Sequence, residues 1–101
     1  MPFGDFINAV PPLGFLVIHI VLFVLGAFFA WRSFGADAPV LGSAFSLFAL
    51  AEVSYMTYHL DWTTFLFAHT ISEVLDLGAF LLVFVAATRT ILRPSTAPAR
   101  A

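Results

Sequence analysis

Residues 52–76 decide how this chain folds, and they read EVSYMTYHLDWTTFLFAHTISEVLD. The stretch joins the end of one long apolar run to the start of another, and its ionisable groups recur at helical spacings. They are Glu52, Tyr55, His59, Asp61, His69, Glu73 and Asp76. Ionisable groups inside apolar sequence are costly in a membrane, so their presence there usually marks function. We therefore predict that they form one polar site.

The composition indicates a membrane protein. Of 101 residues, 61% are hydrophobic and only 10% are charged, far from the balance of a soluble globular protein. Residues 1–101 are expected to form a single membrane domain. The chain has four basic residues and no Cys, which argues against a nucleic-acid-binding protein and excludes disulfides and thiolate metal ligands.

We predict an all-α integral membrane protein with three antiparallel transmembrane helices, at about residues 12–32, 39–60 and 63–90. A run of about 20 apolar residues is long enough to cross a bilayer. Turn and helix-start residues separate the runs: Gly35, Asp37 and Pro39 after the first, and Asp61 and Trp62 after the second. Short loops are therefore expected, and residues 95–101 are expected to form a disordered tail.

The arginines predict the orientation. Arg32 ends the first run, and Arg89 and Arg93 end the third. Positive residues near span ends favour the cytoplasmic side. We therefore expect a protein of the cytoplasmic (inner) membrane, with its N-terminus outside and its C-terminus inside.

The acidic groups then lie in the outer half of the membrane without a basic partner. A carboxylate facing lipid near the bilayer centre costs about 2.5–3.5 kcal/mol, so the polar faces of the helices are expected to turn inward. Neither Lys nor Arg occurs in that half. The compensating charge must be a proton, a protonated His or a metal ion.

Cation binding is accordingly the first function hypothesis. We predict a metal site formed by His69, Glu73, Asp76, Glu52 and His19, with a secondary polar path through His59, Tyr55 and Asp61. Imidazole and carboxylate ligands suit Zn, Mn, Fe or Cu(II), and protons are the other cation considered. No catalytic residues are assigned, and no enzymatic activity of the chain on its own is predicted.

Other functions fit the same residues. In one, the chain is a small accessory subunit of a larger energy-transducing, pigment-containing or quinone-containing membrane complex, and the cluster is a proton relay or a packing network. In another, His19 or His69 ligates haem or chlorophyll, which the acidic surroundings disfavour. In every case we expect contact with the lipid bilayer and a homo-oligomer or larger complex. Gly42, Ser46 and Ala49 form a stripe of small residues that would let helices approach closely.

Overall fold

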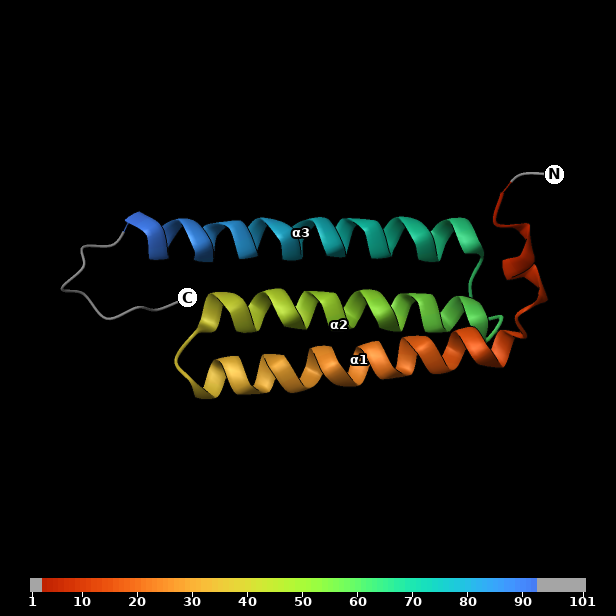
Figure 1. Ribbon diagram of the computed structural model, residues 1–101, viewed down its shortest axis with the longest axis horizontal. Coiled ribbons are helices and arrows are strands. Elements are labelled where there is room, and N and C mark those ends of the chain that lie inside the picture. Colours follow the sequence, from red (N-terminus) through yellow and green to blue (C-terminus); the bar gives the residue numbers. More distant parts are fainter. Residues whose placement is uncertain (1–2, 93–101) are drawn as a thin grey trace.

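The computed structural model describes residues 3–92, and its regular structure in that range is entirely helical (Figure 1). A short 3-10 helix, η1 (Asp5–Ala9), precedes α1 (Pro12–Gly35), α2 (Pro39–His59) and α3 (Phe65–Leu92). All three α-helices are long and apolar enough to span a membrane. The predicted all-α fold with three such helices is confirmed. The predicted tail, residues 95–101, lies outside the described range.

The helix boundaries follow from local sequence chemistry. Prolines occupy the first positions of α1 and α2, where a missing backbone N–H costs nothing. Helix α1 continues to Gly35, three residues beyond the prediction. Helix α3 begins at Phe65 rather than residue 63, because Thr64 precedes it and its hydroxyl accepts a hydrogen bond from the Phe67 N–H at 3.4 Å.

Helices α1 and α2 end in the same way, with an aspartate in the left-handed conformation. Asp37 has a φ of 60° and Asp61 a φ of 62°. In each case the next residue closes the helix: the Ala38 N–H donates to the Ser33 carbonyl at 2.8 Å, and the Trp62 N–H donates to the Thr57 carbonyl at 2.9 Å. This is the Schellman motif, and Asp tolerates the required conformation better than most residues. Both motifs produce short turns.

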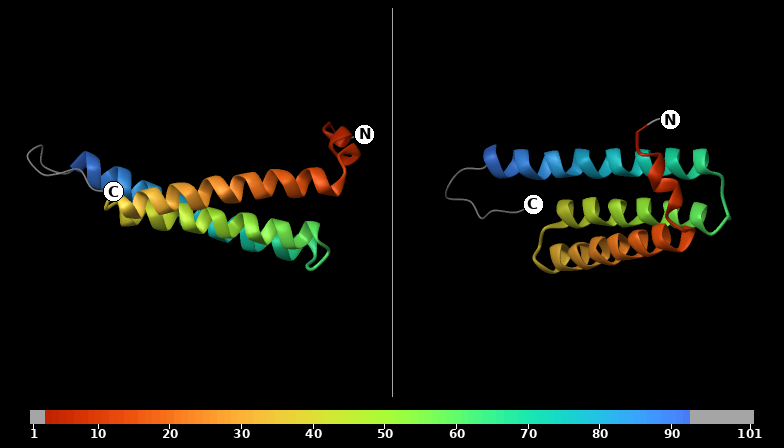
Figure 2. Two further views of the ribbon diagram at one scale, coloured as in Figure 1. Left: turned by 90° about the horizontal axis from the view of Figure 1, so that it is seen from below. Right: turned by 45° about the vertical axis from the view of Figure 1, so that its right-hand side comes forward.

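The three helices form one layer with α2 in the middle (Figure 1). Helix α1 packs along one side of α2 and α3 along the other, and within residues 3–92 α1 and α3 do not pack against each other. The chain reverses direction at each turn (Figure 1). Helix η1 turns away from the α1 axis (Figure 2).

Small residues allow α1 and α2 to approach closely. A Cβ atom added at Gly26 would lie 2.8 Å from the Phe48 ring and 3.4 Å from the Ala49 Cβ, and Gly42 lies against the Phe34 ring. Ser46 donates to the Gly42 carbonyl at 2.8 Å. The predicted stripe of small residues thus contributes to packing inside the chain, since Gly42 and Ala49 both face α1. This close packing brings α1 side chains against the polar half of α2.

Candidate functional site

The central contact of the site joins α1 to α2. His19 Nδ1 lies 2.5 Å from Glu52 Oε2, and Glu52 is only 6% exposed although it is ionisable. An imidazole nitrogen and a carboxyl oxygen in contact can share one proton in a charge-assisted hydrogen bond. The sequence assigned both residues to one cluster, and the structure brings these two together directly.

Aromatic rings extend this contact toward the α2–α3 turn. The His19 ring stacks on Tyr55, with centroids 5.0 Å apart, and on His59, at 5.1 Å. His59 in turn stacks on Phe15 at 5.3 Å. Glu52, Tyr55 and His59 share one face of α2 because they are spaced three and four residues apart. The face that the sequence predicted is therefore the one that packs on α1.

Tyr55 also reaches α3. Its hydroxyl lies 3.5 Å from His69 Nδ1, the outer limit for a hydrogen bond, and His69 stacks on Phe65 at 5.2 Å. Tyr55 therefore contacts both outer helices from the middle one. Asp61, the last residue predicted for the polar path, is exposed in the turn beyond the ring stack.

The two α3 carboxyl groups lie apart from the His19–Glu52 pair. Glu73 is exposed on the surface of α3, whereas Asp76 is half-buried between α2 and α3. Asp76 is close enough to Glu52 and Glu73 for their charges to repel. With residues 3–92 it makes no hydrogen bond or ion pair.

The five predicted metal ligands are therefore not gathered around one point. Over residues 3–92, no three His, Asp or Glu side chains form a group that could hold a metal ion. Zinc sites in proteins have three or four protein ligands. The geometry supports a two-residue His19–Glu52 site and a separate Asp76 site.

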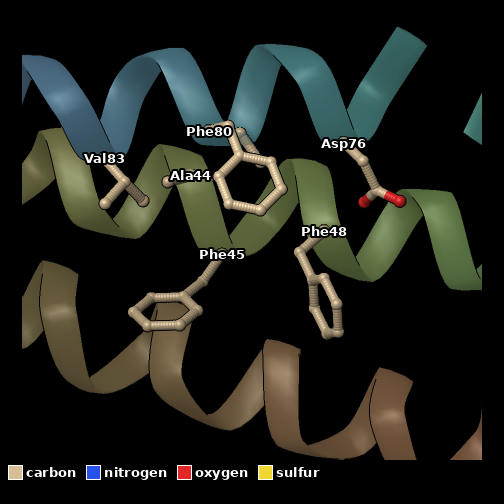
Figure 3. Close-up of a pocket in the computed structure, with 7 residues that line it drawn as sticks. Ala44, Phe45, Phe48, Asp76, Phe80 and Val83 are labelled. Atoms are coloured by element: carbon tan, nitrogen blue, oxygen red, sulfur yellow. The ribbon is translucent and has the colours of Figure 1, made fainter. Parts of the chain in front are cut away.

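Asp76 lines a cavity of about 160 Å³ between α2 and α3 (Figure 3). Three phenylalanines line it as well: Phe45 and Phe48 from α2, and Phe80 from α3. The sequence analysis assigned these Phe residues no role in the site. The sequence alone does not show that these residues lie near Asp76, because the cavity is formed by two different helices.

Ser72 is a second residue that the sequence analysis missed. It is fully buried, and its hydroxyl donates to the Ala51 carbonyl of α2 at 2.9 Å. Its position three residues after His69 and four before Asp76 places it on the same face of α3. That spacing was the available signal.

Comparison with protein-family models, with curated proteins and with solved structures finds no match for this chain.

Proposed function

We propose that this chain is a three-span, antiparallel membrane protein in which the His19–Glu52 pair binds a proton within the bilayer. The observation that carries the proposal is the 2.5 Å contact between His19 Nδ1 and Glu52 Oε2. At about 1.5 Å per residue, His19 lies about 10 Å from the start of α1. A shielded acid and imidazole at that depth form a natural proton-binding unit.

The net charge of the His19–Glu52 pair explains why we propose a proton as the bound cation. Imidazolium beside carboxylate, or neutral imidazole beside carboxylic acid, gives a pair with no net charge. Loss of one proton leaves a single negative charge, which an apolar environment disfavours. No third ligand is available for a metal ion among residues 3–92. One proton can therefore satisfy the pair without further groups.

The polar groups continue from the pair toward one end of the layer only. His59 and Tyr55 stack on His19 on the side of the α2–α3 turn. On the other side, Gly26, Phe48 and Ala49 close the α1–α2 contact with apolar atoms. A proton could thus reach the pair from one face of the membrane but would find no further polar path within this chain.

A polar path that reaches only one end of the layer favours a role as a subunit of a larger membrane complex. A second feature supports that role: Glu73 is exposed in the first half of α3, within the span, where contact with lipid would cost up to about 2.5–3.5 kcal/mol. A neighbouring chain, either a second copy or another protein, would cover it. In this assembly the His19–Glu52 pair would relay protons; a static packing network is the competing role.

The orientation follows from the arginines. Arg32 and Arg89 lie in the last turns of α1 and α3, at the same end of the layer (Figure 1). That end would face the cytoplasm. The N-terminus and the open end of the polar path would then lie outside the cytoplasmic membrane.

Nitrogen-15 NMR of histidine-labelled protein tests the proton site. The chain has three His residues, so their signals can be assigned by single substitutions. We expect the His19 Nδ1 signal in the wild type to report a proton shared with Glu52, because the two groups are in hydrogen-bond contact. In the Glu52→Gln variant, which keeps the shape of the side chain but lacks the carboxyl group, the His19 Nδ1 signal should change.

Glu73→Gln is the matched control. It removes a carboxyl group of the same kind from an exposed position on α3, and it should leave the His19 signals unchanged. His19 nitrogen signals that Glu52→Gln does not alter would overturn the proton site and leave the packing role.

A further inference from the structure

The cavity beside Asp76 exists because small residues line it where larger ones would fill it. Ala44 of α2 is 3% exposed and Ala79 of α3 is 9% exposed, and both line the space. Gly78 lets the two helices approach at the same level, because a Cβ atom added there would lie 3.2 Å from Leu47. The backbones are therefore close, and the short Ala side chains leave room between the neighbouring rings.

Among residues 3–92, Asp76 is the one ionisable residue that lines this cavity. In Figure 3 its side chain extends from α3 toward α2, at one end of the group of phenylalanines. It has no hydrogen bond or ion pair with residues 3–92, and the nearby charges of Glu52 and Glu73 repel it. A carboxyl group in this position is stabilised either by holding a proton of its own or by a cation from outside residues 3–92.

The remaining walls decide which kind of cation fits. They consist of aromatic rings and aliphatic groups and provide no second oxygen or nitrogen side chain. An inorganic ion would lose its hydration shell here and gain only one ligand group. The faces of Phe rings, in contrast, attract organic cations through cation–π interactions. One carboxylate at the end of a pocket lined by Phe80 and by Phe45 and Phe48, whose rings also contact α1, is suited to an ammonium group attached to an apolar body.

The pocket is open on its outer side, where Phe80 and Val83 are exposed, so its volume gives only the size of the part of that body that it can shelter. An engineered cavity of about 150 Å³ in another protein holds one benzene molecule, and the cavity here measures about 160 Å³. A single ring or a short branched alkyl group would fill it. We propose that this cavity binds a lipid-soluble organic ammonium ion, with the ammonium group at Asp76 and the apolar body among Phe45, Phe48 and Phe80.

This inference does not depend on the proton role of the His19–Glu52 pair. Asp76 lies on the α3 side of α2, whereas His19 approaches from α1. The site would let the chain bind a membrane-dissolved amine. Binding at this cavity can be measured independently of the His19–Glu52 pair.

The experiment is a titration of the full-length chain in detergent with 2-phenylethylamine, which is an ammonium ion at neutral pH. Carbon-13 labelling of alanine methyl groups provides a local signal, because Ala44 and Ala79 line the cavity. Propylbenzene, which has the same ring and chain length without the charge, is the neutral probe. Saturable shifts of both methyl signals are expected with the amine.

Two variants separate the charge from the space. Asp76→Asn keeps the shape and should weaken binding of the amine at least tenfold while leaving propylbenzene binding unchanged. Ala44→Leu should fill the cavity and abolish binding of both probes. Glu73→Gln, which removes the neighbouring carboxyl group outside the cavity, should not weaken amine binding.

Three outcomes would overturn the proposal. In the first, the wild type shows no saturable shift with the amine. In the second, Asp76→Asn binds the amine as tightly as the wild type, so the carboxyl group is not the recognition element. In the third, a second protein co-purifies with the wild type, is lost in Asp76→Asn and is not displaced by the amine; the cation would then be a side chain of that partner. If Ala44→Leu does not fold, the Asp76→Asn comparison decides the matter alone.

Discussion

Glu52 shows how one residue acquires its role from its neighbours. Its carboxyl group is shielded from solvent by α1 and α2, and its hydrogen-bond partner is His19. Removal of one member leaves the other buried without a partner, which costs more than the net contribution of the pair. The interaction should therefore be visible as a coupling between two substitutions.

A double-mutant cycle measures this coupling. His19→Leu and Glu52→Leu should each destabilise the protein, and the double variant should be less destabilised than the sum of the two. We expect a coupling of about 0.5–3 kcal/mol, the range for residues in direct contact. Equilibrium unfolding in mixed detergent micelles provides the free energies.

The control cycle pairs Glu52→Leu with His59→Leu. His59 stacks on His19 and makes no hydrogen bond to Glu52, so its coupling to Glu52 should be clearly smaller. Equal coupling in the two cycles would mean that the His19–Glu52 contact has no special energetic role.

At the scale of elements, α2 has two different faces. One face carries Glu52 and Ala49 against α1, and the other carries Ala51 and Leu47 against α3. Helices α1 and α3 have only one neighbour each within residues 3–92. Cross-linking between pairs of helices can therefore test which helices are neighbours.

Engineered disulfides test the packing of α1 on α2. The chain has no Cys, so an introduced pair has no competing thiol. Gly26→Cys with Ala49→Cys should form a disulfide on mild oxidation, because the two Cβ positions lie 3.4 Å apart, close to the usual distance of about 3.8 Å. The Phe48 ring must rotate slightly to admit the new side chain. A mobility shift on non-reducing gels detects the bond.

The control pair is Gly26→Cys with Gly78→Cys. These residues lie on α1 and α3, which do not pack together, so no intramolecular disulfide should form. Efficient cross-linking of this pair, or none between positions 26 and 49, would contradict the helix order.

At the scale of the whole molecule, charge is distributed unevenly between the two ends of the layer. Arg32 and Arg89 lie at one end, and the turn that carries Asp61 lies at the other. Few exposed side chains in the helices are polar, and most of the outer surface consists of large apolar residues. This surface suits lipid contact, while the arginines give the layer a preferred direction.

Single-cysteine labelling tests that direction. Trp62 is 74% exposed in the α2–α3 turn, and Gly35 is exposed at the end of α1. In intact cells, a membrane-impermeant maleimide should label Trp62→Cys and should label Gly35→Cys only after the membrane is opened. The reverse pattern would invert the orientation while leaving the polar sites intact.

The sequence by itself determined the three helices and their approximate ends. Uninterrupted apolar runs, prolines at helix starts and aspartates in the turns act locally, so they can be read without knowledge of the fold. The predicted helix ends differ from the observed ones by only a few residues; α3, for example, begins at Phe65 and not at residue 63. Residues at the end of a helix can belong to either the helix or the adjoining turn, so their assignment is the hardest to predict. The sequence also determined which polar residues share a face within one helix.

Only the tertiary structure decided which polar residues meet. Helical spacing places Glu73 and Asp76 near each other on α3, but the rotation of α3 against α2 leaves Glu73 exposed and directs Asp76 into a cavity. The close contact at Gly26 sets the height at which His19 meets Glu52. Rotation and height depend on how side chains of different helices interlock, which is a property of pairs of surfaces and not of any single stretch of sequence.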